Sequence, residues 1–296
     1  MTRYKISLYP LVTALIATLL LPTACGFRGG SNHQSSTTAD SVIEAAVAQR
    51  QFDRVLALAD SFEATREITE VEADLRRAWA YHRKKEYGTA EQYYNKVLAA
   101  SVRTDEDRKL VQKAAGYYAD MLYIKHDYEG ALRVAVPMIE KIEKQGGDNN
   151  DAMVLLLSSV GRCQMKLRRI DEARETFKKD YEYSLQTIAA DTSAMVLHNV
   201  VVHTGNIAIR FLNAEAFTDA KLWLDRLEQL LLQYAGRSNA KTTFVSEYKA
   251  RIQIYRAYLL QKLGNSTQAA EVYKQFMASD YAKSDDGKID ACEYLI

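Results

Sequence analysis

Proline is scarce in this chain, and long runs of β-branched residues are almost absent. Only three of the 296 residues are proline, and two of these, Pro10 and Pro22, lie within the first 25 positions. Alanine, leucine, glutamate, lysine, arginine and glutamine, all good helix formers, fill nearly half of the chain. Because strands favour β-branched residues, the composition predicts an all-α fold. Pro137 is then expected to kink or to start a helix at about residues 131–144.

Sequence motifs for catalysis and metal binding are also missing. The chain has no glycine-rich phosphate loop and no nucleophile elbow. His198 and His203 are five residues apart, whereas a zinc pair on one helical face needs a spacing of four with a glutamate between. Carboxylates near the C-terminus have partial calcium-loop spacing, but Ala282 stands at the first ligand position, and Asp285 or Asp286 as a helix N-cap explains them equally. We expect no enzyme activity, no metal and no cofactor in these residues.

Charge of one sign and paired cysteines are lacking too. Without Arg3 and Lys5, the chain has 37 basic against 38 acidic residues. A nucleic-acid partner is not expected, since it would require a surplus of lysine and arginine on one face. Beyond position 25, the cysteines are Cys163 and Cys292, too far apart in a repeat array to form a disulfide.

What the chain does contain is a repeated pattern. Six times a short polar break is followed by a small or apolar residue, with apolar or aromatic residues at helical spacing after it. Successive units lie 35, 41, 42, 47 and 49 residues apart. Such self-similarity is typical of stacked helix pairs that share one continuous core. It predicts about six antiparallel pairs in a single domain, residues 41–296. The breaks are Gln51-Phe52, Glu86-Tyr87, Asp127-Tyr128, Arg169-Ile170, Ala216-Phe217 and Gly264-Asn265, followed by Val55, Ala90, Ala131, Ala173, Ala220 and Ala269.

One unit resembles a known family. From Ala78 to Val97, the order of small residue, aromatic, tight turn with Tyr87, and the small residue Ala90 resembles the tetratricopeptide repeat (TPR), and weaker matches lie around Gly161 and Ala257. The resemblance covers about residues 41–280 and implies a right-handed α-solenoid that binds a protein or peptide. Only the first spacing is near the usual ~34 residues, and the family's closing proline is missing, so we expect longer helices and variable connections.

The first 25 residues resemble a secretion signal. Arg3 and Lys5 precede an apolar stretch at 11–21 that is too short for a stable membrane span. Ala24-Cys25 ends a segment similar to a bacterial lipoprotein cleavage box, although Pro22 replaces the usual leucine. We predict a signal peptide at 1–24, a lipid on Cys25 as the membrane anchor, a flexible linker at 25–40 and a periplasm-facing position in the cell envelope. Plain secretion or an uncleaved anchor are the alternatives.

The family resemblance also indicates where a partner would bind. In tetratricopeptide proteins the first helix of each pair lines the concave groove, and an exposed aromatic with charged neighbours suits a peptide or a helix. The alternative is that these residues only pack between helices, as most of the 19 tyrosines are expected to do. The predicted groove residues are Trp79, His82, Asp120, Tyr123, Arg162 and Tyr258, with Met165, Ile209, Leu212 and Gln261 on the same faces.

The C-terminal segment 288–296 is predicted to open a further first helix that lacks a covering partner at Tyr294, Leu295 and Ile296. We therefore expect the domain to continue beyond 296 or this helix to dock elsewhere. The arrangement resembles the periplasmic input region of bacterial membrane sensor histidine kinases, whose kinase or phosphatase domain would follow in a longer chain. The alternatives are a stand-alone lipoprotein scaffold for outer-membrane assembly or trafficking, and a glycan-binding TPR lipoprotein. The sequence leaves the partner, inner or outer membrane, and the oligomeric state open.

Overall fold

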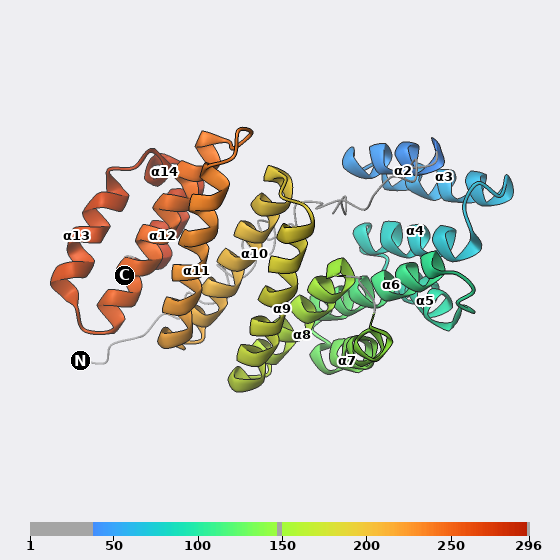
Figure 1. Ribbon diagram of the computed structural model, residues 1–296, viewed down its shortest axis with the longest axis horizontal. Coiled ribbons are helices and arrows are strands. Elements are labelled where there is room, and N and C mark those ends of the chain that lie inside the picture. Colours follow the sequence, from blue (N-terminus) through green and yellow to red (C-terminus); the bar gives the residue numbers. More distant parts are fainter. Residues whose placement is uncertain (1–37, 147–149, 295–296) are drawn as a thin grey trace, which may run out of the picture.

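The computed structural model describes residues 38–146 and 150–294, and within these ranges the regular structure is entirely helical. Twelve of the helices form six consecutive pairs, which follow one another along the long axis of the molecule (Figure 1). The predicted all-α solenoid is thereby confirmed. The pairs are α2 (Thr38–Ala48) with α3 (Phe52–Ala64), α4 (Glu70–Arg83) with α5 (Tyr87–Ala99), α6 (Asp105–Ile124) with α7 (Tyr128–Gln145), α8 (Asn150–Lys166) with α9 (Ile170–Ala190), α10 (Ala194–Asn213) with α11 (Phe217–Ala235), and α12 (Thr242–Lys262) with α13 (Ser266–Met277).

The turn within each pair has the same construction six times. Three residues connect the two helices, and the middle one has a positive φ angle between 57° and 83°. In the second pair, for example, the Lys85 N–H donates to the carbonyl of His82 and the Glu86 N–H to that of Tyr81, which satisfies the last helical carbonyls as in a Schellman motif. These turns coincide with the predicted polar breaks. The positive-φ residues are Arg50, Lys85, His126, Arg168, Glu215 and Gly264.

Small residues allow the two helices of a pair to approach closely. The residue predicted to follow each break, Val55 in the first pair and alanine in the other five, is at most 2% exposed. On five of the six first helices, the residue seven positions before the positive-φ residue is also small and buried. At Gly161 an added Cβ would lie 2.5 Å from the Phe177 ring. This second set is Ala78, Ala119, Gly161, Ala208 and Ala257.

Polar side chains cap the starts of several helices. The Thr69 hydroxyl accepts from the Glu72 N–H at the start of α4, and the Ser193 hydroxyl accepts from the Val196 N–H at the start of α10. Thr104 and Asp107 form a reciprocal capping box at the start of α6. Helix α7 begins at Tyr128 and continues past Pro137, so the proline does not start it.

The buried apolar residues form three clusters rather than one. The first joins α2 to α4, the second joins α4 to α8, and the third extends from α8 to the C-terminal end. On the two helices α9 and α10 lies a polar group that we call the polar seam, composed of Asp180 and Ser184 on α9 and His203 and Thr204 on α10. Asp180, Ser184 and Thr204 are each at most 1% exposed.

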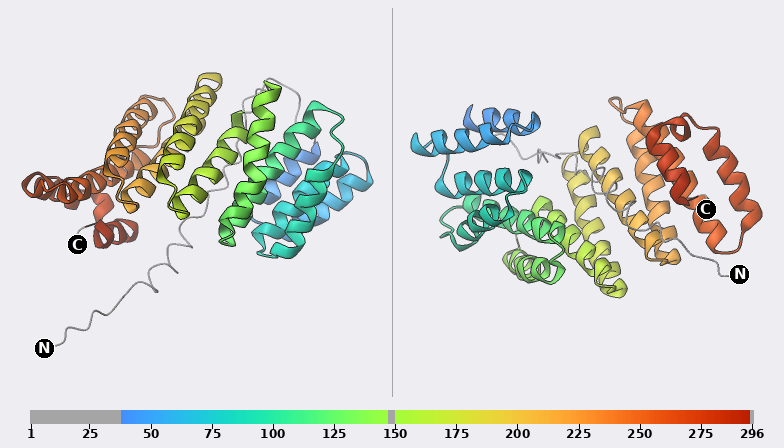
Figure 2. Two further views of the ribbon diagram at one scale, coloured as in Figure 1. Left: turned by 90° about the horizontal axis from the view of Figure 1, so that it is seen from below. Right: turned by 180° about the vertical axis from the view of Figure 1, so that it is seen from behind.

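The C-terminal end differs from the prediction. After α13 come the single-turn helix α14 (Asp280–Lys283) and α15 (Asp285–Tyr294), which pack against the last pair (Figure 2). Tyr294 is 4% exposed, so the expectation that it lacks a packing partner was wrong. The N-cap of α15 is Ser284, whose hydroxyl accepts from the Gly287 N–H, instead of Asp285 or Asp286. Leu295 and Ile296 lie outside the described residues.

At the other end, α2 begins at Thr38, three residues before the predicted start of the repeat domain. The predicted signal peptide at 1–24, Cys25 and most of the linker lie outside the described residues. Within the described ranges, no helix combines the length and the apolar character needed to cross a membrane.

Candidate functional site

The predicted groove residues share two registers on the first helices. Trp79, Asp120, Arg162 and Tyr258 each lie six positions before the positive-φ turn residue, whereas His82 and Tyr123 lie three positions before it. Since 3.6 residues make one turn, these two registers are on the same side of each helix. We call this side the first-helix face.

Three of the predicted residues meet at the centre of this face. The Arg162 guanidinium on α8 donates to the Asp120 carboxylate on α6 at 2.5 Å. The same guanidinium lies over the ring of Tyr123, 4.4 Å from its centroid. Because the ion pair and the cation–π contact use two neighbouring first helices, they join the third and the fourth pairs across the face.

A fourth residue, Arg210 on α10, belongs to this group and was not predicted. It lies close enough to interact electrostatically with Arg162 and Asp120, and its side chain hydrogen-bonds to Tyr123. The prediction selected Ile209, one position away, because that residue has the register of Arg162. The signal for Arg210 in the sequence is an arginine set between the apolar residues Ile209 and Phe211 of a helix that is otherwise mostly apolar. We call Asp120, Tyr123, Arg162 and Arg210 the central cluster.

The two guanidiniums of the central cluster have different electrostatic environments. Burial opposes the charge on Arg162, but the ion pair with Asp120 outweighs it and raises the pKa of Arg162. For Arg210, burial and the like charge of Arg162 lower the pKa. Among the described residues no carboxylate forms an ion pair with Arg210. The cluster therefore holds two cations and one anion, and a further carboxylate at Arg210 would be stabilised.

Behind the central cluster lies the polar seam. The Asp180 carboxylate accepts from His203 Nε2 at 2.7 Å, and burial raises the pKa of Asp180 although His203 opposes this. The second carboxylate oxygen of Asp180 and the hydroxyls of Ser184 and Thr204 are buried with no hydrogen-bond partner in the structure. Buried polar atoms of this kind are usually satisfied by internal water, so the region behind Arg162 is polar as well as enclosed.

His82 does not line an open groove. It is 5% exposed, and its Nδ1 lies 3.2 Å from the hydroxyl of Tyr94, which is fully buried on the second helix α5. Burial lowers the pKa of His82 to about 4. A partner cannot reach this imidazole without opening the pair, so His82 belongs to the core.

Trp79 and Tyr258 lie on the first-helix face but already have neighbours. The Trp79 ring packs edge-on against Phe52 of the preceding pair, with centroids 5.8 Å apart, and Arg83 lies over it. Tyr258 contacts Tyr294 of α15 with centroids 5.2 Å apart. Of the six predicted residues, Asp120, Tyr123 and Arg162 are therefore the three that form one local group. Cys25 lies outside the described residues.

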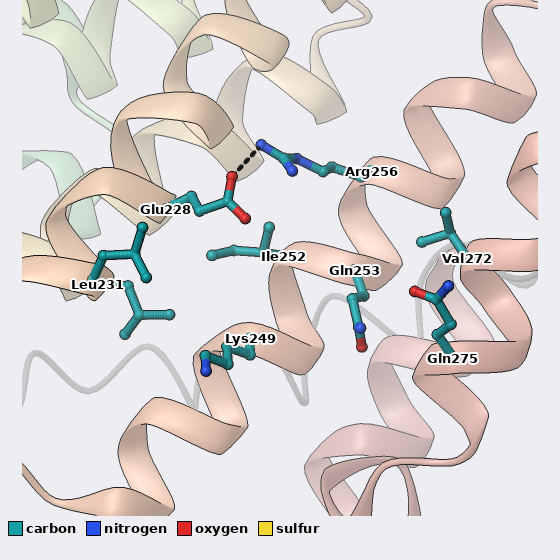
Figure 3. A pocket seen from close by; sticks show the side chains of 9 residues that line it. Glu228, Leu231, Lys249, Ile252, Gln253, Arg256, Val272 and Gln275 are labelled. Atoms are coloured by element: carbon teal, nitrogen blue, oxygen red, sulfur yellow. Dashed lines mark hydrogen bonds and ion pairs between the residues drawn. The ribbon is translucent and has the colours of Figure 1, made fainter. Parts of the chain in front are cut away.

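One of the described hollows is on another part of the surface. It has a volume of about 330 Å³ and lies between α11, α12 and α13 (Figure 3). Its carboxylate, Glu228, is already paired with Arg256 at 2.8 Å, and Leu231 and Ile252 in its wall are core residues. We interpret this hollow as a gap between packed helices and place the candidate site on the first-helix face.

Comparisons with known proteins agree with this architecture. The family model described as "Tetratricopeptide repeat" matches residues 73–101, which hold α4 and α5 apart from the first residues of α4. Residues 73–101 are therefore similar to one tetratricopeptide repeat. No curated protein matches the sequence.

A solved structure described as "Functional Characterization of Pseudomonas Aeruginosa pilF" has a similar fold, with a TM-score of 0.52 and 14% sequence identity. The match covers 87% of this chain and 96% of that chain. At this identity the likeness concerns the fold alone. The likeness in fold thus extends well beyond the 29 residues that the family model matches.

Proposed function

We propose that this tetratricopeptide protein is a scaffold that binds a protein or peptide partner on its first-helix face and is held at a membrane by a lipid on Cys25. Tetratricopeptide repeats generally mediate protein–protein interactions, and the chain's solenoid presents a repeated face suited to an extended ligand. The lipid anchor and the periplasm-facing position are supported by the sequence around Ala24 and Cys25 alone.

The observation that carries the binding site is the central cluster. Arg162 is fixed by Asp120 and Tyr123, so its guanidinium needs little reorganisation to bind a ligand. Arg210 beside it has no carboxylate partner among the described residues. A partner with an acidic side chain next to an aromatic or apolar one would pair with Arg210 and pack on Tyr123.

Two roles fit such a scaffold. One is the sensory input region of a signalling protein, and the other is a stand-alone lipoprotein that serves assembly or trafficking at the outer membrane. The likeness to the Pseudomonas aeruginosa structure supports a helical scaffold in both cases. Sequencing the gene beyond the codon for Ile296 separates them, because a membrane span followed by a kinase or phosphatase domain would select the sensor. A glycan-binding lipoprotein has less support, since only Trp79 and Trp223 supply tryptophan.

The binding site is tested with a photo-crosslinking amino acid in cells that express the full chain. One variant carries it at Tyr123, and the matched control carries it at Tyr181, whose ring is covered by Arg226 at 4.6 Å on the second helices. We expect a crosslinked protein from Tyr123 that disappears with Arg162→Ala and persists with Arg226→Ala. Equal crosslinking from Tyr181, or no effect of Arg162→Ala in a folded protein, would contradict the proposed site.

A further inference from the structure

The C-terminal helix α15 lies on the same face as the central cluster, at the last pair. Its contacts on α12 are Arg251, Tyr255 and Tyr258, which are spaced four and three residues apart and so form one stripe. Tyr258 has the register of Asp120 and Arg162. The segment 280–294 therefore covers the portion of the first-helix face that belongs to α12.

One aromatic side chain anchors this helix. The Tyr294 ring lies edge-on to Tyr255 and Tyr258, with centroids 5.1 and 5.2 Å away. Its carbonyl accepts from the Tyr273 hydroxyl at 2.5 Å, and its own hydroxyl lies 3.5 Å from the side-chain oxygen of Asn213 at the end of α10. Tyr294 thus sits where the first-helix faces of α10 and α12 meet.

A polar contact holds the middle of the helix. The Arg251 guanidinium donates to the Tyr281 hydroxyl at 2.7 Å, and that hydroxyl donates to the Asp290 carboxylate at 2.7 Å. Asp290 and Tyr294 are four residues apart, so an acidic and an aromatic residue project from one side of α15.

The rest of α15 contributes little to its docking. Of its ten residues only Gly287 and Tyr294 are buried, whereas Ile289 is 38% exposed. A helix of this length is not stable alone in water. Asp290 and Tyr294 supply its main side-chain contacts with α12. Ala291 also packs against the core, and Gly287 lies close to the Tyr281 carbonyl. An unrelated helix could supply the same two main contacts.

We propose that α15 is an exchangeable occupant of the first-helix face. The partner that binds at α12 is an amphipathic helix with an acidic residue four positions before an aromatic one, which takes the places of Asp290 and Tyr294. The inference rests on the proposed function for the existence of a partner, but the exchange itself is a property of this chain and is testable without one.

The test uses the full chain and a labelled synthetic peptide with the sequence of residues 280–294. Tyr294→Ala weakens the chain's own docking, and Lys288→Ala, on an exposed position of the same helix, is the matched control. By fluorescence anisotropy we expect the peptide to bind the Tyr294→Ala protein at least tenfold more tightly than the wild-type or Lys288→Ala protein. A peptide with alanine in place of the tyrosine should not bind. Amide hydrogen exchange in α12 should slow when the peptide is added.

The proposal is contradicted if α15 serves only as a structural cap on the last pair. In that case the Tyr294→Ala protein does not bind the peptide, although its circular dichroism shows a folded solenoid, and the proposal is overturned. If Tyr294→Ala does not fold, Asp290→Asn takes its place, and failure of both variants to fold would make α15 an integral part of the core and overturn the proposal too.

A dimer in which copies exchange α15 would support the proposal and identify a second copy as the partner. Peptide exchange without any Tyr123 crosslink would leave this inference standing and count against the proposed function.

Discussion

Gly161 of α8 faces the ring of Phe177 of α9 so closely that a Cβ atom on the glycine would lie 2.5 Å from a ring carbon. Phe177 is fully buried and contacts Phe211 and Trp223 in edge-to-face arrangements. The ring has no free space in which to move away. The approach of the two helices in the fourth pair is therefore set by the absence of a side chain at one position.

The first prediction follows from this contact. Gly161→Ala should lower the free energy of unfolding by about 1–3 kcal/mol through overpacking, despite a gain of up to ~1 kcal/mol in helix propensity. Gly88→Ala is the matched control, because nothing lies within 4 Å of the added Cβ, and it should be neutral or stabilising. Denaturant and thermal unfolding followed by circular dichroism measure both. Equal stability of the two variants would contradict the close packing.

The second prediction concerns the turns within the pairs. Gly264 has φ +83°, a left-handed conformation in which a Cβ costs roughly 1–2 kcal/mol, so Gly264→Ala should destabilise the last pair by about that amount. Gly236→Ala is the control, since Gly236 has φ −77° and ordinary contact distances. The melting temperature of each variant is the readout, and a destabilised Gly236→Ala with an unaffected Gly264→Ala would contradict the turn assignment.

The third prediction concerns pH. Burial lowers the pKa of His82 to about 4, below its ordinary value of 6.5. The unfolded chain therefore binds a proton at a pH where the folded chain does not, and stability should fall as pH drops from about 6.5 to about 4. A shift of this size corresponds to roughly 3 kcal/mol at most.

His82→Asn, which keeps an acceptor near the Tyr94 hydroxyl, should remove most of this pH dependence. His126→Asn, at an exposed turn, is the control and should retain it. Unfolding free energies at pH 7.0, 5.5 and 4.5 give the comparison. A wild-type protein and a His82→Asn protein with parallel pH profiles would show that His82 does not titrate in this way.

The fourth prediction concerns the membrane anchor. Cells that express the complete chain should incorporate labelled palmitate, because Cys25 follows the small residue Ala24 at the end of an apolar leader. Cys25→Ser should abolish the label and release the protein from the membrane fraction. Cys292→Ser, which changes an exposed cysteine of the solenoid, should do neither. Labelling that survives Cys25→Ser would place the anchor elsewhere.

Much of the fold could be predicted because it depends on local signals. The spacing of polar breaks located all six turns, and small residues such as Ala90 and Ala173 lie buried at the helix crossings, where the predicted pairs meet. The long spacings between units also predicted that the helices are longer than those of a usual repeat, and helices such as α9 and α12 have 21 residues each.

The site was less predictable, because register alone does not determine exposure. His82 and Tyr123 have the same register, but His82 is enclosed by Tyr94 and Tyr87 of the following helix, whereas Tyr123 is half-buried beneath Arg162. Tyr258 has the register of Arg162, but α15 folds back over it. Contacts of this kind join residues far apart in sequence, such as Asn213 and Tyr294, and no periodic pattern encodes them.

The division of the core into three apolar clusters has a calorimetric consequence. A protein with one core absorbs its heat of unfolding in a single transition, for which the calorimetric and van't Hoff enthalpies agree. Here the buried apolar residues of the described ranges form three clusters, and stacked repeats couple only to their neighbours. The calorimetric enthalpy should therefore exceed the van't Hoff enthalpy, because the helix pairs around one cluster can melt while those around another remain folded.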